Sequence, residues 1–484
     1  MKQTLAWVCA AIIFLAACAT STPAPTARPT HSADSSAYST TLFSPQPSTG
    51  TVSSARLADA RPNIIFILTD DQPYHTVDYM PTVRDVLMKN GVVFENGFVT
   101  TPLCCPSRAS IWTGEYAHNH GVLTNRLPLG GAKKFDETQS VAIPLQASGY
   151  RTAYFGKYMN GYEDLTPFGR VPLGWDMWGA LLDRVQSEED AGSTNFYNGF
   201  SLSQNGTVVE YSGDKSIFSA DLITQNAVNF ISESRDEPFF LVMAYYNPHS
   251  PYFWADRHEG QFRANSFLRA DPFRPPDFME ADVSDKPQWL QDLNPISVEK
   301  IDISYKQILR SLLSVDDGVA SVLAALDSTG LSDNTIIVFM SDNGLTVGDH
   351  RLGLSKNCVY EACVRVPFIV YAPSMFAART DSNLVANIDL APTFSELAGI
   401  PISARVDGMS ILSLLRDPSS MWRDALLLEH WPSEEGVGSK IPEFYAVRTA
   451  QWKYVEYVTG EVELYDLVAD PYELKARLDE LKGE

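Results

Sequence analysis

Short apolar runs rich in β-branched and aromatic residues alternate with helical stretches from about residue 61 onward, and this alternation constrains the fold most. It is typical of an α/β protein, in which a large, mixed but mostly parallel sheet carries helices on both faces. Helices are predicted over residues 82–90 and much of 297–328, because Gly91 and Gly330 follow them. The clearest predicted strands are residues 63–68, 152–155, 238–245, 335–340 and 366–371.

The last part of the chain has a different pattern. Three short runs follow one another closely and predict antiparallel strands, at residues 445–449, 452–458 and 461–465. An amphipathic helix is predicted after them, around residues 471–481. We therefore expect a main domain over residues 61–420 and a small C-terminal α+β domain with an antiparallel sheet over residues 421–484.

The N-terminus has the features of an export signal. Lys2 precedes an apolar run over residues 5–17, which is shorter than the ~20 residues that a membrane-spanning helix needs. The run ends in LAAC at Cys18, which resembles the lipobox of bacterial lipoproteins. The sequence thus predicts a signal peptide over residues 1–17, a lipid anchor on Cys18 and attachment to the bacterial cell envelope. The alternative is an ordinary signal peptide with an incidental cysteine.

A segment rich in Ser, Thr, Pro and Ala follows over residues 18–60. Its composition predicts a disordered tether, because few large apolar side chains are present to offset the entropy of ordering. The whole chain has 59 acidic and 37 basic residues, for a formal net charge of −22. Such a charge is unfavourable for nucleic acid, which is bound by basic patches. It is equally unfavourable for a small anionic substrate, unless a local cluster of cations reverses the field.

Polar residues follow four of the five predicted strands. Ligands in open α/β sheets bind beyond the carboxyl ends of the strands, so these residues are candidates for one site. Two of the segments carry oxygen ligands that suit Ca²⁺ or Mg²⁺, although an isolated Asp in this position is more often a turn or helix cap. The segments contain Asp70-Asp71, Asp342-Asn343, Gly156-Lys157 and Asn247-Pro248-His249-Ser250.

Cys104 lies in a run, PLCCPSRASIWTG, that predicts a tight turn followed by a helix. Backbone N–H groups and the helix dipole stabilise an anion in such a place. Arg108, one turn further on, is suited to hold a nucleophile or a negative substrate. Two other interpretations stay open from these residues alone: a pair of buried structural cysteines, or a thiolate nucleophile with His118 or His120 as its base.

The same run resembles the signature of the sulfatase family, C-x-P-S-R followed by A-S-I-W-T-G, whose first cysteine is oxidised after translation to formylglycine. Other family motifs follow in the expected order, including Lys356-x-x-x-Tyr360-Glu361 and ELYDL-x-x-DP-x-E at residues 463–473. The resemblance implies an alkaline-phosphatase-like fold, an enzyme that hydrolyses a sulfate monoester, and a formylglycine-generating enzyme as a partner during maturation.

The resemblance also implies the roles of individual residues. The aldehyde at residue 104 hydrates to a diol, one hydroxyl attacks sulfur, and the second then expels sulfate. The implied ligands of one Ca²⁺, with Mg²⁺ as an alternative, are Asp70, Asp71, Asp342, Asn343 and an oxygen of residue 104. Arg108 and Lys157 are implied to hold the diol, and Lys356 and His249 to hold the sulfate.

The chain departs from many sulfatases after Lys157, where a Lys-x-His pattern is replaced by Lys-Tyr-Met, ending at Met159. Asn160 and His118 are the candidates to replace the missing histidine. The segments GKYMNGYE, VPLGWDMWG and NPHSPY resemble instead the branch of N-acetylglucosamine-6-sulfatase and the extracellular endosulfatases. This branch implies a 6-O-sulfated amino sugar as substrate.

Three other functions stay open: an arylsulfatase of broad specificity, a phosphatase or phosphonate hydrolase of the same superfamily, and a non-catalytic glycan-binding lipoprotein if Cys104 is not oxidised. The expected substrate is a small sulfated molecule or a glycan terminus, because a local cluster of cations lies within an acidic chain.

The remaining cysteines and aromatic residues are expected to be structural. Cys105, Cys358 and Cys363 are predicted as free buried thiols rather than as a disulfide. Trp175 and Trp178 are predicted to pack in the core rather than against a sugar ring. His350 is a further candidate for the wall of the substrate pocket.

Overall fold

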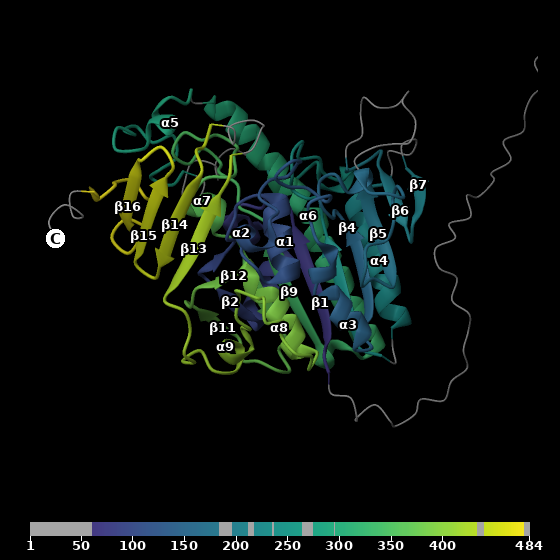
Figure 1. Cartoon of the computed structure of the whole chain (residues 1–484). Coiled ribbons are helices and arrows are strands. Elements are labelled where there is room, and N and C mark those ends of the chain that lie inside the picture. The colour runs from purple at the N-terminus through teal and green to yellow at the C-terminus, as the bar shows by residue number, and fades with distance from the viewer. Residues whose placement is uncertain are drawn as a thin grey trace, which may run out of the picture. The chain divides into compact units, whose positions relative to one another are not determined.

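The computed structural model describes residues 61–182, 196–211, 217–234, 237–263, 274–294, 296–432 and 440–478 of the 484-residue chain (Figure 1). These residues belong to one compact unit. The predicted signal peptide over 1–17, the predicted lipidation site Cys18 and the predicted tether over 18–60 lie outside the described residues. None of the helices in the described part of the chain has both the length and the apolar character needed to cross a membrane.

A ten-stranded sheet forms the centre of the fold. In sheet order its strands are β11 (Arg379–Asp381), β2 (Val92–Phe94), β10 (Phe368–Tyr371), β9 (Thr335–Ser341), β1 (Asn63–Thr69), β8 (Phe239–Ala244), β4 (Arg151–Gly156), β5 (Met177–Leu182), β6 (Ser201–Gln204) and β7 (Thr207–Glu210). The five strands from β9 to β5 run parallel, and antiparallel neighbours extend them on both sides. All five predicted strands of this region are present, in the predicted mixed sheet.

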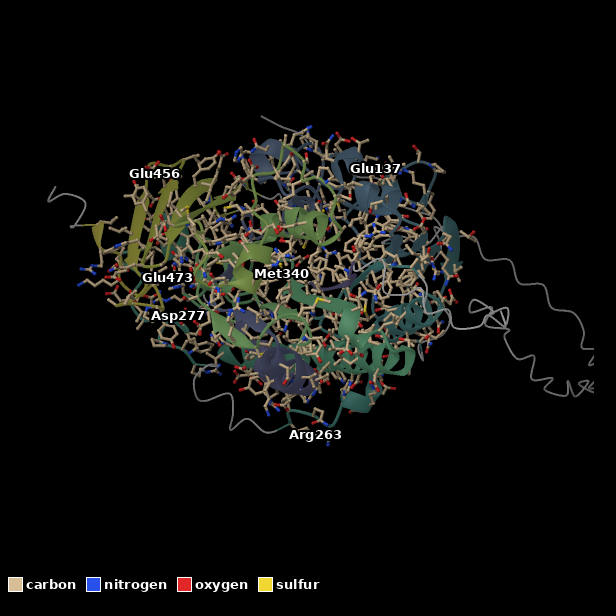
Figure 2. All side chains as sticks on the ribbon, turned by 90° about the horizontal axis from the view of Figure 1, so that it is seen from below. Glu137, Arg263, Asp277, Met340, Glu456 and Glu473 are labelled. Atoms are coloured by element: carbon tan, nitrogen blue, oxygen red, sulfur yellow. A yellow bond between two sulfur atoms is a disulfide. The ribbon has the colours of Figure 1, made fainter. Side chains whose placement is uncertain are left out.

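Successive side chains of a strand point to opposite faces of the sheet, and both faces of this sheet are buried. Ile64 and Phe66 of β1 belong to a core with residues of α1 (Cys104–Thr113), α3 (Ala142–Ala147) and α8 (Leu390–Leu397). Ile65 and Ile67 belong to a second core with residues of α4 (Ser219–Glu233) and α6 (Val298–Thr329). Helices therefore cover both faces, as predicted (Figure 1). Met340 of β9 is fully buried, and Figure 2 shows it in the interior of the molecule.

The two predicted helices are present. The Ser297 side chain accepts a hydrogen bond from Lys300 N at the start of α6, and Gly330 ends the helix with a φ of 68°. The helix predicted over residues 82–90 contains a π-helix, η2 (Val83–Met88), in its middle. Its first turn is attached to α6, because Asp316 accepts hydrogen bonds from the backbone of Thr82 and Val83, both at 2.9 Å.

The C-terminal part contains a separate antiparallel sheet of four strands. They are β13 (Ala425–His430), β14 (Phe444–Thr449), β15 (Trp452–Tyr457) and β16 (Val462–Asp466). The last three were predicted and β13 was not. Residues of this sheet share a third core with Tyr360 and the segment around α7 (Glu361–Val364). The domain boundaries at 61–420 and 421–484 stay a prediction.

The helix predicted around residues 471–481 is wrong for its first half, since residues 471–477 form turns and loops. Their backbone N–H groups bind elsewhere: Arg477 N donates to Leu464 O at 2.8 Å and Ala476 N donates to Asp285 Oδ2 at 2.7 Å. Glu473 has a left-handed φ of 55°. The side-chain pattern was helical, but these tertiary contacts fix an irregular backbone. Residues 479–481 lie outside the described residues.

Candidate active site

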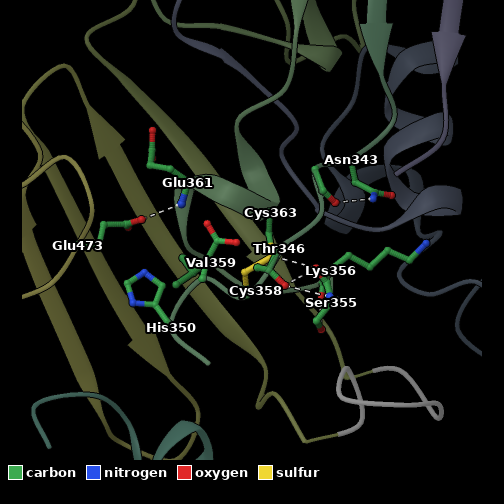
Figure 3. Close-up of a disulfide and its surroundings, with 12 residues drawn as sticks. Asn343, Thr346, His350, Ser355, Lys356, Cys358, Val359, Glu361, Cys363 and Glu473 are labelled. Carbon is green, nitrogen blue, oxygen red and sulfur yellow. Dashed lines mark hydrogen bonds between the residues drawn. A yellow bond between two sulfur atoms is a disulfide. The ribbon is translucent and has the colours of Figure 1, made fainter. Parts of the chain in front are cut away.

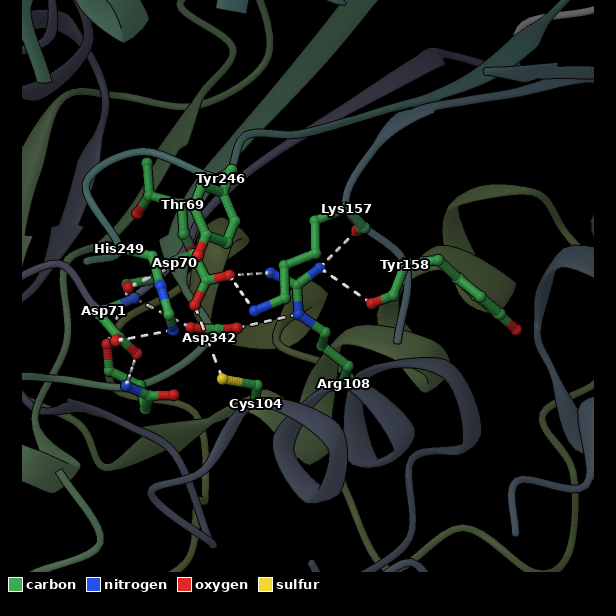
Figure 4. Close-up of polar contacts among 12 residues, drawn as sticks. Thr69, Asp70, Asp71, Cys104, Arg108, Lys157, Tyr158, Tyr246, His249 and Asp342 are labelled. Atoms are coloured by element: carbon green, nitrogen blue, oxygen red, sulfur yellow. Dashed lines mark hydrogen bonds and ion pairs between the residues drawn. The ribbon is translucent and has the colours of Figure 1, made fainter. Parts of the chain in front are cut away.

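The carboxyl ends of four neighbouring strands bring the predicted polar segments together. β9, β1, β8 and β4 are adjacent and parallel, so the residues that follow them lie at one edge of the sheet. Backbone hydrogen bonds join the segments: Asp342 N donates to Thr69 O at 3.0 Å, and Asp70 N donates to Asn247 O at 3.1 Å. Figure 4 shows Asp70, Asp71, Asp342, Lys157 and His249 grouped around Cys104.

Asp70, Asp71, Asp342 and Asn343 form a buried acidic cluster. Asp71 N donates to Asp342 Oδ1 at 3.2 Å, and Asn343 Nδ2 donates to Asp71 Oδ1 at 2.7 Å. Asn343 Oδ1 has no hydrogen-bond partner among the described residues, although it is buried. Burial and the nearby charge of Asp70 raise the pKa of Asp342 to about 6. The cluster therefore has both an unused oxygen and closely spaced negative charges.

This cluster fits a divalent hard cation. Ligand atoms of Asp70, Asp71, Cys104 and His249 all lie within 4.8 Å of one another. Carboxylates and an amide oxygen are the ligands that Ca²⁺ and Mg²⁺ prefer. Asn343 Oδ1 would coordinate a bound cation, and the positive charge of the cation would offset the repulsion among the carboxylates. Of the four residues with these ligand atoms, Asp70, Asp71 and residue 104 were predicted as metal ligands from the sequence. The structure adds His249, whose ring nitrogen lies beside the same three ligand atoms.

Cys104 is the first residue of α1 and is fully buried beside the acidic cluster. Its Sγ lies 3.6 Å from Asp70 Oδ1 and 3.0 Å from Lys356 Nζ. Burial raises the pKa of the Cys104 thiol to about 12, so the unmodified thiol is uncharged at neutral pH. This argues against the thiolate nucleophile considered from the sequence.

The two histidines considered as bases for that thiolate have other partners. His118 Nδ1 lies 2.8 Å from Glu429 Oε2 on β13, and His120 Nε2 lies 3.1 Å from Ser110 Oγ. Burial lowers the pKa of His120 to about 3. His120 is therefore uncharged at neutral pH, and both rings are occupied by contacts away from Cys104.

Two buried cations lie on one side of the cluster. Arg108 Nε donates to Asp342 Oδ2 at 2.9 Å, and its Nη1 donates to Lys157 O at 2.6 Å. Lys157 Nζ forms an ion pair with Asp70 Oδ2 and lies 5.4 Å from the centre of the Tyr246 ring. Burial disfavours the charge of Lys157, but the attraction of Asp70 raises its pKa above the usual value. Both side chains are therefore positive at neutral pH.

Lys356 and His249 lie on the side of Asp71. Lys356 Nζ is 2.7 Å from Asp71 Oδ1, and His249 Nε2 is 3.5 Å from Asp71 Oδ2. Burial disfavours the charge of Lys356, but Asp71 raises its pKa well above the usual value. Burial lowers the pKa of His249 despite Asp71 and Asp70. The groups of the site that are positively charged at neutral pH are therefore Arg108, Lys157 and Lys356.

A cavity of about 580 Å³ opens over these groups. Its polar lining includes Lys157, His249 and Lys356, and also Asn160, a predicted pocket residue. Its apolar lining comes from side chains that include Leu127, Leu129, Phe196, Leu345 and Leu354. The size is that of a small-molecule site.

His118 and His350, the other predicted pocket residues, lie outside the lining of this cavity. His118 contacts Glu429 of the C-terminal sheet. His350 is buried with its Nδ1 2.6 Å from Glu280 Oε2. These carboxylates explain the placement, because each gives a histidine ring a hydrogen-bond partner away from the cavity.

Comparison with known proteins identifies the chain. The model of the family described as Sulfatase matches residues 62–400, and that of N-sulphoglucosamine sulphohydrolase, C-terminal, matches residues 348–483. The chain belongs to the sulfatase family. Human N-acetylglucosamine-6-sulfatase is 33% identical to this sulfatase over 457 residues, which cover 85% of the chain and 80% of the relative.

Two extracellular sulfatase homologues, from Caenorhabditis elegans and Drosophila melanogaster, are each 34% identical to the chain. The matches cover 78% and 77% of this chain but only 54% and 33% of those relatives. A solved structure whose protein binds its substrate D-glucosamine-2-N,6-O-disulfate superposes with a TM-score of 0.72 at 25% identity. That match covers 87% of this chain and 94% of the solved chain. The fold is therefore the alkaline-phosphatase-like sulfatase fold with an added antiparallel sheet. Membership of the family implies a formylglycine cofactor and a divalent metal.

The predicted free thiols at Cys358 and Cys363 are wrong, because these two residues form a disulfide (Figure 3). Their Cα atoms lie 5.6 Å apart, because the turn at α7 brings the chain back on itself. The spacing of the two cysteines in the sequence did not predict this turn of the chain. Cys105 is a buried free thiol, as predicted. Trp175 and Trp178 are buried in the core, also as predicted.

Two asparagines that support the nucleophile segment were missed. Asn125 Oδ1 accepts a hydrogen bond from Cys105 N at 2.8 Å. Asn387 Oδ1 accepts from Thr100 N at 3.1 Å, while its Nδ2 donates to Ser107 Oγ at 3.0 Å. Both asparagines fix the position of α1 relative to its surroundings. A single asparagine in a loop carries no pattern from which the sequence would predict this role.

Proposed function

We propose that this sulfatase hydrolyses a sulfate monoester with formylglycine, made from Cys104, as its nucleophile. The observation that carries the proposal is the position of Cys104 Sγ, 3.6 Å from Asp70 Oδ1 and 3.0 Å from Lys356 Nζ, at the start of a buried helix. A negative group at this point is stabilised by the start of α1 and by the nearby cations. The chain belongs to a family of sulfuric ester hydrolases, which supports this activity.

The hydrated aldehyde at residue 104 would supply the hydroxyl that attacks sulfur, and one Ca²⁺ would supply positive charge beside it. The acidic cluster would hold this cation through Asp70, Asp71, Asp342 and Asn343, with residue 104 beside them. The unpartnered Asn343 Oδ1 supports this ligand set. Mg²⁺ is the alternative cation, because the same oxygen ligands suit it.

The basic side chains divide between the nucleophile and the substrate. Arg108 and Lys157 lie on the Asp342 and Asp70 side and would hold residue 104 in its reactive orientation. Lys356 and His249 lie on the Asp71 side and line the cavity, so they would bind the sulfate. One of these two would give a proton to the leaving alcohol.

We propose a 6-O-sulfated N-acetylglucosamine, as a small molecule or at a glycan terminus, as the substrate. The human relative is named N-acetylglucosamine-6-sulfatase, and the solved neighbour is described with a 6-O-sulfated glucosamine as its substrate. The cavity combines charged groups at the sulfate position with apolar side chains suited to the faces of a sugar. The net charge of −22 favours a short substrate, because a long polyanion would be repelled outside the cavity.

An arylsulfatase of broad specificity is the second candidate. An arylsulfatase of Volvox carteri is 30% identical over 87% of this chain. The leucines of the cavity lining would also accept an aromatic ring. Rates of sulfate release from N-acetylglucosamine-6-sulfate and from nitrophenyl sulfate separate the two candidates. Faster release from the sugar supports the first, and a clear preference for the aryl ester supports the second.

Export, lipid anchoring on Cys18 and modification by a formylglycine-generating enzyme complete the proposal. The extracellular relatives support export. Labelling with a radioactive fatty acid, lost in Cys18→Ser, would test the anchor.

Mass spectrometry of the peptide that spans residue 104 tests the central proposal. An aldehyde at residue 104, together with sulfate release by the same preparation, is the expected result. A thiol at this position in active enzyme would contradict it. A thiol in protein that binds glycans without turnover would favour a non-catalytic lipoprotein.

A further inference from the structure

The segment over residues 355–364, here called the Lys356 segment, carries one of the charged groups of the site. Lys356 Nζ is 2.7 Å from Asp71 Oδ1 and 3.0 Å from Cys104 Sγ. The next residue, Asn357, has a left-handed φ of 75° and donates its backbone N–H to Pro102 O at 3.1 Å. A non-glycine residue keeps such a conformation only where its surroundings enforce it. The position of Lys356 is therefore set by contacts beyond its own side chain.

A disulfide closes the segment on itself. Cys358 and Cys363 are bonded, and Cys363 O accepts a hydrogen bond from Gly344 N at 2.9 Å (Figure 3). Gly344 directly follows Asn343 of the acidic cluster, and a Cβ on Gly344 would lie 2.2 Å from Ala362 O. The Lys356 segment thus packs closely against the loop that carries Asp342 and Asn343.

The C-terminal part of the chain holds the other side of the segment through a buried ion network. Lys453 Nζ of β15 donates to Val359 O at 3.0 Å and pairs with Glu361 Oε1 at 2.8 Å and Glu473 Oε1 at 2.7 Å. Glu473 Oε2 accepts a hydrogen bond from Glu361 N at 2.8 Å. Lys453 is fully buried, and the exposed fraction of Glu473 is 2%. Figure 3 shows Glu473 directed at Glu361.

A neighbouring contact joins the same two parts of the chain. Tyr360 OH donates to Glu463 Oε1 at 2.9 Å. Tyr360 and Glu361 belong to the motif that begins at Lys356, while Glu463 and Glu473 begin and end the closing motif. The proposed reaction uses only Lys356 from these two motifs. Tyr360, Glu361, Glu463 and Glu473 contact one another and do not belong to the lining of the substrate cavity.

We propose that Glu473 and Lys453 are positioning residues that place Lys356 in the active site through the backbone of the Lys356 segment. This inference rests on the proposed function for its kinetic consequence. Glu473 fixes Glu361 N, Lys453 fixes Val359 O, and the disulfide carries this constraint towards residue 356. Removal of the network lets the segment shift, so that Lys356 no longer lies between Asp71 and residue 104.

Chemical acylation of lysine, followed by mass spectrometry, tests the placement without any need for turnover. The Lys356 side chain is 17% exposed in the intact site. In Glu473→Ala we expect faster acylation of Lys356 by acetic anhydride than in the wild type. Glu456→Ala is the matched control, because Glu456 lies on β15 of the same sheet, is exposed and contacts Tyr454. Unchanged acylation of Lys356 in Glu473→Ala would overturn the proposal.

Kinetics of the paired variants separate positioning from general stability. We expect Glu473→Ala to lower kcat/KM about 10- to 100-fold, because small displacements of a catalytic group have effects of this size. The same change in a Lys356→Ala background should have little further effect, because the group that it positions is already absent. Equal losses in both backgrounds would show that Glu473 does not act through Lys356.

If Glu473→Ala does not fold, Glu473→Gln replaces it, since it keeps the size of the side chain and removes the charge that pairs with Lys453. If the wild type releases no sulfate from any ester, the proposed function fails, whereas the acylation of Lys356 still tests the placement by Glu473 and Lys453.

Discussion

Lys356 Nζ lies 3.0 Å from Cys104 Sγ, although the two residues are 252 positions apart in the chain. Cys104 begins a helix on one face of the central sheet, whereas Lys356 lies in a loop that follows β9. In the folded chain β1 and β9 are paired in parallel, and Lys356 and Cys104 meet at the carboxyl ends of these strands. A positive group is thereby placed next to the proposed nucleophile, whose Sγ is buried.

Cys104→Ala should abolish turnover and leave the fold intact. The substitution removes the atom from which formylglycine is made, and we expect kcat to fall by at least about 10³-fold. Circular dichroism and sulfate release measure the two effects. Cys105→Ser is the control, because Cys105 is the adjacent buried thiol, and it should keep sulfate release. Substantial turnover by Cys104→Ala would exclude residue 104 as the nucleophile.

Removal of divalent cations should lower both activity and stability. The buried acidic cluster has closely spaced carboxylates and an oxygen, Asn343 Oδ1, with no partner in the described part of the chain. A bound cation should therefore stabilise the folded state by about 3 kcal/mol at 100 times its dissociation constant. Differential scanning calorimetry with EDTA, and again with added Ca²⁺ or Mg²⁺, measures the shift in Tm. Asp342→Asn should make this shift smaller. A Tm that is indifferent to EDTA and to both cations would contradict the site.

Arg108→Ala should destabilise the fold strongly. Arg108 is fully buried and pairs with Asp342 at 2.9 Å and with Asp70 at 3.5 Å, so its loss leaves buried carboxylates without this partner. We expect the free energy of unfolding to fall by about 3–5 kcal/mol. Arg84→Ala is the matched control, because Arg84 forms an exposed pair with Asp85, and it should change this free energy far less than Arg108→Ala does. Similar losses in the two variants in urea titrations would refute the argument.

The contribution of His350 to stability should fall as the pH rises. Burial opposes protonation of His350, but the hydrogen bond to Glu280 raises its pKa above the usual value. The paired imidazolium therefore stabilises the fold fully below about pH 6.5, the unfolded value. This contribution is lost as the pH rises through the pKa of the folded protein. The difference in unfolding free energy between the wild type and His350→Gln should be about 2 kcal/mol at low pH.

Urea titrations from pH 5.5 to 8.5 check this dependence. The difference between the two proteins should shrink towards alkaline pH. A constant difference, or one that grows with pH, would show that His350 does not contribute through its charged form. Figure 2 places the labelled Asp277, a neighbour of His350, on the same side of the molecule as Glu473.

The sequence alone determined the α/β class, the central strands and the motif residues of the site. Strands such as residues 63–68 are apolar on both faces, so their type follows from local composition. Asp70, Lys157 and His249 follow such strands, and the parallel sheet makes their convergence predictable. These features depend on local pattern and on one rule of sheet topology.

Tertiary structure alone decided which of the remaining polar groups meet. Cys358 pairs with Cys363 because α7 turns the chain back, and the segment after Asp470 is irregular because Glu473 binds Lys453 and Glu361 N. The His350 ring contacts the buried carboxylate of Glu280 and does not line the cavity. Ion pairs and hydrogen bonds between distant segments offset the free energy lost on burying each charge. No local sequence pattern predicts which of these groups pair. The sequence therefore specified the chemistry of the site, whereas long-range burial decided which residues hold it in place.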